Sequence, residues 1–225
     1  MENPGHFSAE INSDTAIWHS ETLVVQSIQT KLIQIADRPL VIGARGDIAI
    51  VIQLLGPIVA ASAGKTVDVL IAEFAAALDA ASRSSMTVPE GMDFLAAGYS
   101  ESEGQFLRYA AVDEAQAAAV GFKPWQLVDA PSPVLLTTMK QQEFDEGGFY
   151  SDDFRYGLHH HGVRLLKAVR TIERTWNGRP LVPCGGTLLL ATIRPSGVTY
   201  NPMGGWADLV GQPIQRDAPW IEQCR

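Results

Sequence analysis

The sequence has few residues of the kinds that form covalent bridges or metal clusters. Only two of its 225 residues are cysteines, Cys184 and Cys224. A disulfide framework or a zinc site needs more cysteines, placed at characteristic spacings. We therefore expect no disulfide framework, no metal and no cofactor, and the predicted location is a reducing cytoplasm.

Basic residues are also in the minority. Lysine and arginine together number 17 against 25 aspartates and glutamates, which gives a formal net charge of −8 and a pI of about 5.1. Proteins that bind nucleic-acid backbones carry a basic patch or stripe, and no such stripe occurs here. We therefore expect no nucleic-acid partner.

Long apolar runs are missing as well. A helix that spans a bilayer needs about 18 apolar residues in a row. The segment 47–63 comes closest, but Asp47, Gln53, Gly56 and Pro57 interrupt it. The start of the chain, Met-Glu-Asn-Pro-Gly-His, has neither the basic nor the apolar part of a signal peptide. We expect no membrane partner and no secretion.

The apolar residues that are present suffice for one core. They make up 46% of the chain, and the mean hydropathy is +0.04. This composition predicts a single domain over residues 1–225, with an irregular tail from about residue 201. The periodicities predict strands over 22–35 and 39–43, helices over 48–62 and 66–83, a hairpin of 92–100 and 105–113, a strand near 125–138, a long helix over 152–176 and a final hairpin after residue 184.

This order of elements predicts an α+β fold, because antiparallel hairpins and helices occur in separate blocks. The helices over 66–83 and 152–176 each have one apolar stripe, and they are expected to flank two stacked sheets. The stripe of the long helix includes Leu158, Leu165 and Val169. The segment 48–62 is apolar nearly all round, which predicts burial in the chain or in a homo-oligomer.

A lysine precedes a glycine-rich corner in the first predicted hairpin. Lys31 shares its expected strand face with Ile33 and Ile35. A lysine on a buried face needs a carboxylate partner or has a lowered pKa, and Asp14 is a candidate partner. The alternative is that the lysine stem covers apolar surface while its charged end reaches solvent at an edge strand.

Two other groups suggest chemistry but favour structural roles. His159, His160 and His161 are consecutive, so on a helix they point in different directions and cannot share one ion. A core or rim histidine is the favoured interpretation. Cys184 lies beside two glycines and is a candidate nucleophile, but no histidine is near it in sequence. A buried structural cysteine is the favoured alternative.

Four segments together resemble a known family. They are Ser13-Asp14-Thr15, Lys31, Gly43-Ala44-Arg45-Gly46 and Cys184-Gly185-Gly186. Their order and spacing over roughly residues 9–200 resemble the proteasome β-subunit branch of the N-terminal nucleophile (Ntn) hydrolases. The resemblance implies a four-layer αββα sandwich of two antiparallel sheets flanked by helices, and a homo-oligomer that forms a ring.

The resemblance also implies a chemistry. In that family a terminal threonine attacks the substrate, and its free amine acts as the base. Asp14 and Lys31 match the catalytic aspartate and lysine. Gly43, Arg45 and Gly46 match the corner that binds the substrate and its oxyanion. The implied substrate is a peptide or an amide.

The sequence departs from the family at several positions. Met1 lies only thirteen residues before Asp14, which leaves little room for the strand that carries the nucleophile. Gly186 is the only glycine followed by threonine, so the start has no Gly-Thr processing junction. We therefore expect a homologue that is catalytically silent or lacks its nucleophile strand as given. The alternatives are an active threonine- or serine-type peptidase or amidase with a start upstream of Met1, and a non-enzymatic ring-forming or binding module.

Overall fold

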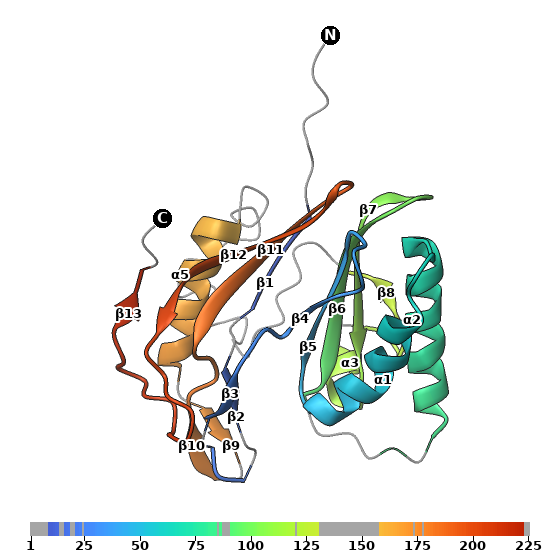
Figure 1. Cartoon of the computed structure of the whole chain (residues 1–225). Coiled ribbons are helices and arrows are strands. Elements are labelled where there is room, and N and C mark those ends of the chain that lie inside the picture. The colour runs from blue at the N-terminus through green and yellow to red at the C-terminus, as the bar shows by residue number, and fades with distance from the viewer. Residues whose placement is uncertain are drawn as a thin grey trace. The chain divides into compact units, whose positions relative to one another are not determined.

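The computed structural model describes residues 9–222, except for 14–15, 19–20, 24, 85, 87–90, 120, 131–157, 173 and 177 (Figure 1). The chain divides into two compact units, and each is described by itself. Unit 1 consists of Met1–Ala9, Leu32–Leu136 and Thr192–Thr199, and unit 2 consists of Glu10–Lys31, Thr137–Ala191 and Tyr200–Arg225.

Unit 1 contains a five-stranded antiparallel sheet. Its order is β4 (Leu32–Gln34), β5 (Leu40–Arg45), β6 (Asp93–Ser100), β7 (Gly104–Ala111) and β8 (Val128–Asp129). Side chains alternate between the two faces of a strand. Ile42 and Phe94 point to one face and Val41 and Leu95 to the other, and all four are buried. Both faces of the sheet are therefore covered.

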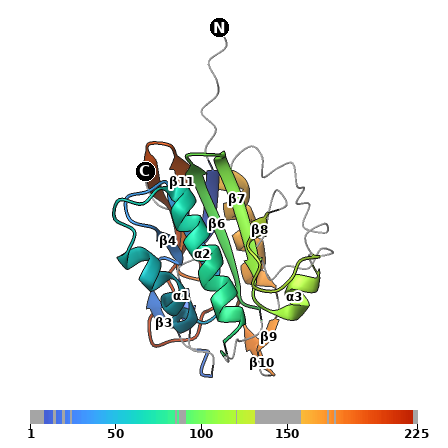
Figure 2. The same ribbon diagram turned by 90° about the vertical axis from the view of Figure 1, so that its right-hand side faces the viewer.

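Two helices cover one face of this sheet (Figure 2). They are α1 (Ile48–Ala60) and α2 (Val67–Ser82). Asp47 caps α1 by accepting a hydrogen bond from the Ala49 N–H at 2.7 Å, and Thr66 caps α2. These helices and the β6–β7 hairpin are confirmed close to their predicted bounds. A short helix, α3 (Glu114–Ala119), follows β7.

The buried stripe of α2 attaches that helix to the sheet. Leu70, Phe74 and Leu78 are fully buried, and the Phe74 ring meets Phe94 edge-on with 5.5 Å between centroids. Aromatic pairs in this geometry add to the free energy of simple burial. The stripe therefore holds α2 over β6.

Most of a second, four-stranded sheet belongs to unit 2. Its order is β1 (Ala9–Ser13), β11 (Thr187–Arg194), β12 (Gly197–Trp206) and β13 (Trp220–Ile221). Two ribbons, β2 (Ala16–Trp18) with β3 (Val25–Ile28) and β9 (Arg174–Trp176) with β10 (Arg179–Leu181), complete the described strands. The helix α5 (Leu158–Thr171) places Lys167 over the Trp220 ring at 4.3 Å.

The predicted long helix is wrong at its C-terminal end. The sequence predicts that it continues to residue 176, but α5 ends at Thr171 and β9 begins at Arg174. The Asn-Gly pair that suggests a helix stop lies between β9 and β10, where Trp176 pairs with Arg179. Asn-Gly is also the strongest short signal for a two-residue hairpin turn, and Gly178 has a φ of +73°. Residues 152–157 of the predicted helix lie outside the described part.

Two other expected boundaries differ from those observed. The single strand expected over 22–35 is broken into β3 and β4, with residues 29–31 between them. In the tail that is expected to be irregular from about residue 201, β12 continues to Trp206 and β13 adds a short edge strand. Glycines in this stretch favour the irregular interpretation, but Gly204 and Gly205 have backbone or ring atoms too close to admit a side chain.

The coarse fold class is confirmed. The described residues form a mixed fold with several antiparallel sheets and four helices, in line with the expected α+β class. Within the same residues no helix is long and apolar enough to cross a membrane.

We predict that Leu165→Ala destabilises the protein by about 2–5 kcal/mol, the usual cost of a buried large-to-small change. Leu165 is 5% exposed on α5, and Val169, one turn further on, is also buried. A urea titration measures the change in the free energy of unfolding. The matched control is Ile221→Ala, because that isoleucine is 54% exposed on β13 and its loss is expected to change stability by less than about 0.5 kcal/mol. Equal effects of the two changes would contradict the assignment of this helix face.

Candidate functional site

The glycine corner begins in the middle of a sheet. Gly43 lies in β5, opposite Leu32 of β4 and Leu95 of β6. Antiparallel pairs alternate between hydrogen-bonded and non-bonded positions. Counting from the bond of the Tyr99 N–H to the Pro39 carbonyl, Gly43 and Leu95 form a bonded pair. The role of Gly43 as an oxyanion donor stays a prediction, and it would require this N–H to leave the ladder.

The corner itself turns at Gly46. This glycine has a φ of +116°, and a Cβ placed on it would lie 2.8 Å from a side-chain carbon of Met92. Only glycine fits such a backbone at such a close approach. The turn then places Asp47 at the start of α1, where it caps the helix, so Gly46 has a clear structural role, and its binding role stays a prediction.

Arg45 of the same corner forms an ion pair with a buried aspartate. Its Nη2 lies 2.6 Å from Oδ2 of Asp93, whose side chain is fully buried, while the Arg45 side chain is 32% exposed. The Gln116 side-chain amide and the Tyr109 hydroxyl, 3.5 Å away, also donate to Oδ2. This network connects β5, β6, β7 and α3.

Burial dominates the electrostatics of this network. It raises the pKa of Asp93, and the Arg45 charge and the hydrogen bonds from Gln116 and Tyr109 only partly oppose the shift. Burial and the nearby Asp93 carboxylate also raise the pKa of Tyr109. The groups that contact the Asp93 carboxyl are thus an arginine, an amide and a phenol. Such a set stabilises a fold and can relay a proton, but it provides no activated nucleophile.

The described structure does not test the predicted pairing of the two catalytic residues. Lys31 is half-buried and lies in a bend directly before β4, so it is outside the strand on which its predicted face depends. Asp14 lies outside the described residues. Lys31 belongs to unit 2, whereas the Gly43–Gly46 corner belongs to unit 1. The pairing of Asp14 with Lys31 stays a prediction.

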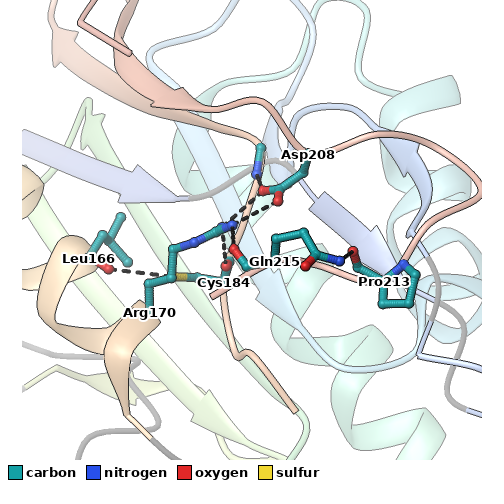
Figure 3. Close-up of polar contacts among 7 residues, drawn as sticks. Leu166, Arg170, Cys184, Asp208, Pro213 and Gln215 are labelled. Carbon is teal, nitrogen blue, oxygen red and sulfur yellow. Dashed lines mark hydrogen bonds and ion pairs between the residues drawn. The ribbon is translucent and has the colours of Figure 1, made fainter. Parts of the chain in front are cut away.

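A second ion pair forms the centre of unit 2 (Figure 3). Arg170 of α5 binds both carboxylate oxygens of Asp208, at 2.9 Å and 2.7 Å. Its guanidinium also donates to the backbone carbonyls of Cys184 and Gln215, and it lies 4.4 Å from the centre of the Trp206 ring. The side chains are 1% and 0% exposed. Planar, two-pronged pairing of this kind is the strongest form of ion pair.

The same aspartate explains the Cys-Gly-Gly segment. The Gly186 N–H donates to Asp208 Oδ2 at 2.7 Å, and a Cβ on Gly185 would lie 2.6 Å from that oxygen. The buried Cys184 donates its thiol to the Leu166 carbonyl of α5 at 3.4 Å. Gly185 therefore leaves space for the Asp208 carboxylate, and Gly186 binds it through its N–H. The hydrogen bond of Cys184 joins this segment to α5.

The histidine cluster gives no metal site in the described part of the chain. His161 is half-buried on α5, while the side chains of His159 and His160 lie outside that part. The described residues contain no group of three or more histidine, cysteine or acidic side chains that could hold a metal ion.

Sequence reasoning singled out Arg45 but missed its partner Asp93, and it missed both Arg170 and Asp208. Asp93 opens a strand of apolar residues, which is the one local signal of a buried carboxylate. Arg170 follows the apolar Val169 on α5, but its partner Asp208 lies 38 positions away. Nothing in the local patterns pairs these two residues.

Comparisons with known proteins identify the fold. No protein-family model matches the sequence, and no curated protein matches it. One similar solved structure is Anbu (ancestral beta-subunit) from Yersinia bercovieri, with a TM-score of 0.52, 12% identity, and coverage of 85% of this chain and 81% of that chain. Another is an Anbu (Gly-1) mutant from Hyphomicrobium sp. strain MC1, with a TM-score of 0.55, 11% identity, and coverage of 86% and 81%. At such identities the likeness shows the fold alone.

These neighbours correct the identification made from the sequence. The resemblance to the proteasome β-subunit branch of the Ntn hydrolases is wrong, because the neighbours are Anbu proteins, which are proteasome-like but distinct. The short motifs mislead because glycine corners and Cys-Gly-Gly turns also have structural roles, as Gly46 and Gly185 demonstrate. What remains is a proteasome-like fold of the Anbu kind.

We predict that Asp93→Asn changes how stability depends on pH. A raised pKa means that the folded chain holds this proton more tightly than the unfolded chain. The proton on Asp93 therefore stabilises the folded chain fully when the pH is below 3.8, the ordinary pKa of an aspartate. This stabilisation is lost as the pH rises through the higher pKa that Asp93 has in the folded chain. The asparagine variant does not titrate here, so its stability relative to the parent rises between about pH 3 and pH 7. The rise amounts to about 1.4 kcal/mol for every tenfold difference in proton affinity between the folded and the unfolded chain.

Urea titrations at the two pH values measure this difference. The control is Asp79→Asn, because Asp79 is exposed and pairs with Arg83 on the surface of α2. A relative stability of Asp93→Asn that falls as the pH rises would show that the Arg45 charge outweighs burial.

We predict that Arg170→Met destabilises the protein by about 3–5 kcal/mol, because it leaves the Asp208 carboxylate buried without its counter-charge. The double change Arg170→Met with Asp208→Asn is expected to recover part of that loss, since no buried charge remains. Arg83→Met, in an exposed pair with Asp79, is the control and should cost about 1 kcal/mol or less. Equal effects of Arg170→Met and Arg83→Met in thermal unfolding would contradict the central role of this ion pair.

Proposed function

We propose that this chain is a self-assembling, proteasome-like subunit that has no peptidase activity of its own. The observation that carries the proposal is a row of exposed aliphatic side chains on α1. Exposed apolar patches above a few hundred Å² are uncommon on monomers and usually mark a partner surface.

The row belongs to a helix without charges. The 13 residues of α1 include no acidic or basic side chain. Ile48, Ile52 and Val59 are 38%, 62% and 38% exposed, and at 3.6 residues per turn they fall within about 40° of one another around the axis. They lie beside the buried face of the helix, which includes Leu54 and Ile58. A second copy of the chain is the proposed cover.

Two further facts support a closed assembly. The net charge of −8 opposes unspecific clumping, so association depends on a defined contact. One of the similar solved structures is named an ancestral β-subunit, and a subunit is by name part of a larger assembly. Symmetric closure is the usual form of such homo-oligomers.

The absence of peptidase activity is supported by how the candidate groups are used. The Gly43 N–H is directed into the ladder with Leu95, and the Arg45 guanidinium binds Asp93. Lys31 is half-buried in a bend between β3 and β4. Gly43 and Arg45 therefore each have a role in the fold that competes with a catalytic one.

We also propose that the two sheets stack as the inner layers of an αββα sandwich. The face of the five-stranded sheet opposite α1 and α2 is apolar and buried at Val41, Leu95 and Tyr109. The four-stranded sheet is the proposed cover for that face, and a crystal structure of the assembly tests this arrangement.

We predict that the purified chain is an oligomer at micromolar concentration and that Ile52→Asp shifts it toward the 24.4 kDa monomer. A carboxylate at the most exposed position of the row would be desolvated in the contact at high cost. Gln53→Asp is the matched control, because it places the same charge on the next residue, which is exposed but outside the row. Light scattering gives the masses, and a parent mass that stays at 24.4 kDa on concentration would remove the proposal.

We predict no hydrolysis of fluorogenic peptide amides by the purified 225-residue chain. The reason is that neither the Asp93 network nor the Asp208 network contains an activated nucleophile. The assay uses the assembled protein, with Lys31→Ala beside it to identify contaminating activity. Turnover that disappears in Lys31→Ala and persists in Lys65→Ala, a lysine paired with Glu73, would refute the proposal of a silent subunit.

A further inference from the structure

A groove on unit 1 has an apolar floor with nothing of the described chain in it. Its volume is about 470 Å³, and it lies between α2 and the β7–β8 side of the sheet. Ile71, Ala72 and Ala75 line it from α2, and Phe106 and Leu127 line it from the sheet. Figure 2 shows β7 and β8 beside α2 rather than beneath it.

The groove follows from the sequence of α2. The large side chains Leu70, Phe74 and Leu78 hold this helix down on the sheet. The neighbouring face carries alanine at positions 72 and 75, whose side chains are too short to reach β7. On the sheet side the apolar lining is therefore Phe106, which is 8% exposed, and Leu127, which is half-buried, and no described residue fills the groove above them.

The rim of the groove is polar but internally satisfied. Asp68 accepts from the backbone N–H and the hydroxyl of Ser102, at 3.1 Å and 2.9 Å. Arg108 donates to Glu103 and pairs with Asp129. These polar groups already have partners, so a ligand would gain little by binding them. An occupant of the groove would instead gain free energy by contacting its apolar lining.

Unit 2 carries a protrusion of matching chemistry. Leu209 and Val210, here called the 209–210 knob, are 57% and 61% exposed. Among the exposed large apolar residues of the described chain they are the one adjacent pair. The knob and the glycine that follows it carry no charge, so they can enter past an acidic rim without desolvating an ion.

The knob is held in place from both sides. On one side Asp208 is bound by Arg170. On the other, the Gly211 N–H donates to the Val25 carbonyl at 2.9 Å, and the Val25 N–H donates to the Gln212 carbonyl at 2.9 Å. A fixed protrusion loses little conformational freedom on docking, which favours its use as a contact.

We propose that the 209–210 knob of one copy inserts into the α2 groove of a second copy. This inference rests on the proposed self-assembly and names a contact within it. Knob and groove are different surfaces, so the contact is heterologous and repeats from copy to copy, forming a ring if the rotation closes. Burial of two aliphatic side chains drives the contact. Each copy has a net charge of −8, so two copies repel each other, and an uncharged contact adds nothing to that repulsion.

Cysteine cross-linking between copies tests the contact directly. In a Cys224→Ser background, chains with Val210→Cys are mixed with chains of a different mass that carry Ala72→Cys. A disulfide forms only between cysteines that come within about 7 Å of each other. We expect a linked product with the summed mass, formed in the mixture and by neither chain alone. The control replaces Ala72→Cys by Ser82→Cys, which is exposed on the same helix outside the groove lining.

A second measurement uses assembly. The double change Leu209→Ser with Val210→Ser is expected to raise the concentration for half-assembly at least about tenfold, and Ala75→Glu is expected to do the same from the groove side. An oligomer of unchanged mass with no cross-link above the Ser82→Cys control would overturn the contact and leave self-assembly standing. A parent protein that is monomeric would instead overturn the proposed function. A cross-link formed within a single chain that carries both cysteines, without linked dimers, would also overturn the contact.

Discussion

The ion pair between Arg170 and Asp208 is the interaction on which unit 2 depends. It is buried at both ends, and it joins the C-terminal part of α5 to the loop after β12. The same guanidinium holds the carbonyls of Cys184 and Gln215, so four chain segments meet at one planar group. Hydrophobic burial alone does not fix the register of such segments, whereas a guanidinium with directed donors does.

Unit 1 also contains an arginine–aspartate ion pair, but there the cost of burying the carboxylate outweighs the attraction of the arginine. Arg45 and Asp93 connect the strands at the glycine corner, but the arginine is partly exposed and the carboxyl group is fully buried. Desolvation therefore prevails at Asp93, whereas Asp208 has both oxygens bound by one cation. In both units a buried acidic residue is bound by an arginine that joins several chain segments.

Local signals predict much of unit 1 and less of unit 2. The caps Asp47 and Thr66 and the apolar stripe of α2 are set within a few residues, so these elements are predicted correctly. The predicted end of α5 is wrong because an Asn-Gly pair serves equally as a helix stop and as a hairpin turn. The two ion pairs could not be predicted, since sequence patterns carry no information on which arginine meets which aspartate. The pairing of Asp14 with Lys31 stays untested, because Asp14 lies outside the described residues.

The close approach of Gly185 to Asp208 means that substitutions at these two distant positions are expected to depend on each other. Any side chain at position 185 would occupy the space of the carboxylate, which in turn exists to balance Arg170. If Arg170 is replaced in a related sequence, Asp208 has no counter-charge and is expected to be replaced as well. Only after the loss of Asp208 does position 185 have space for a residue larger than glycine. The three positions are therefore expected to drift as a group, in a preferred order, and an alignment of homologous sequences would reveal them as covarying sites.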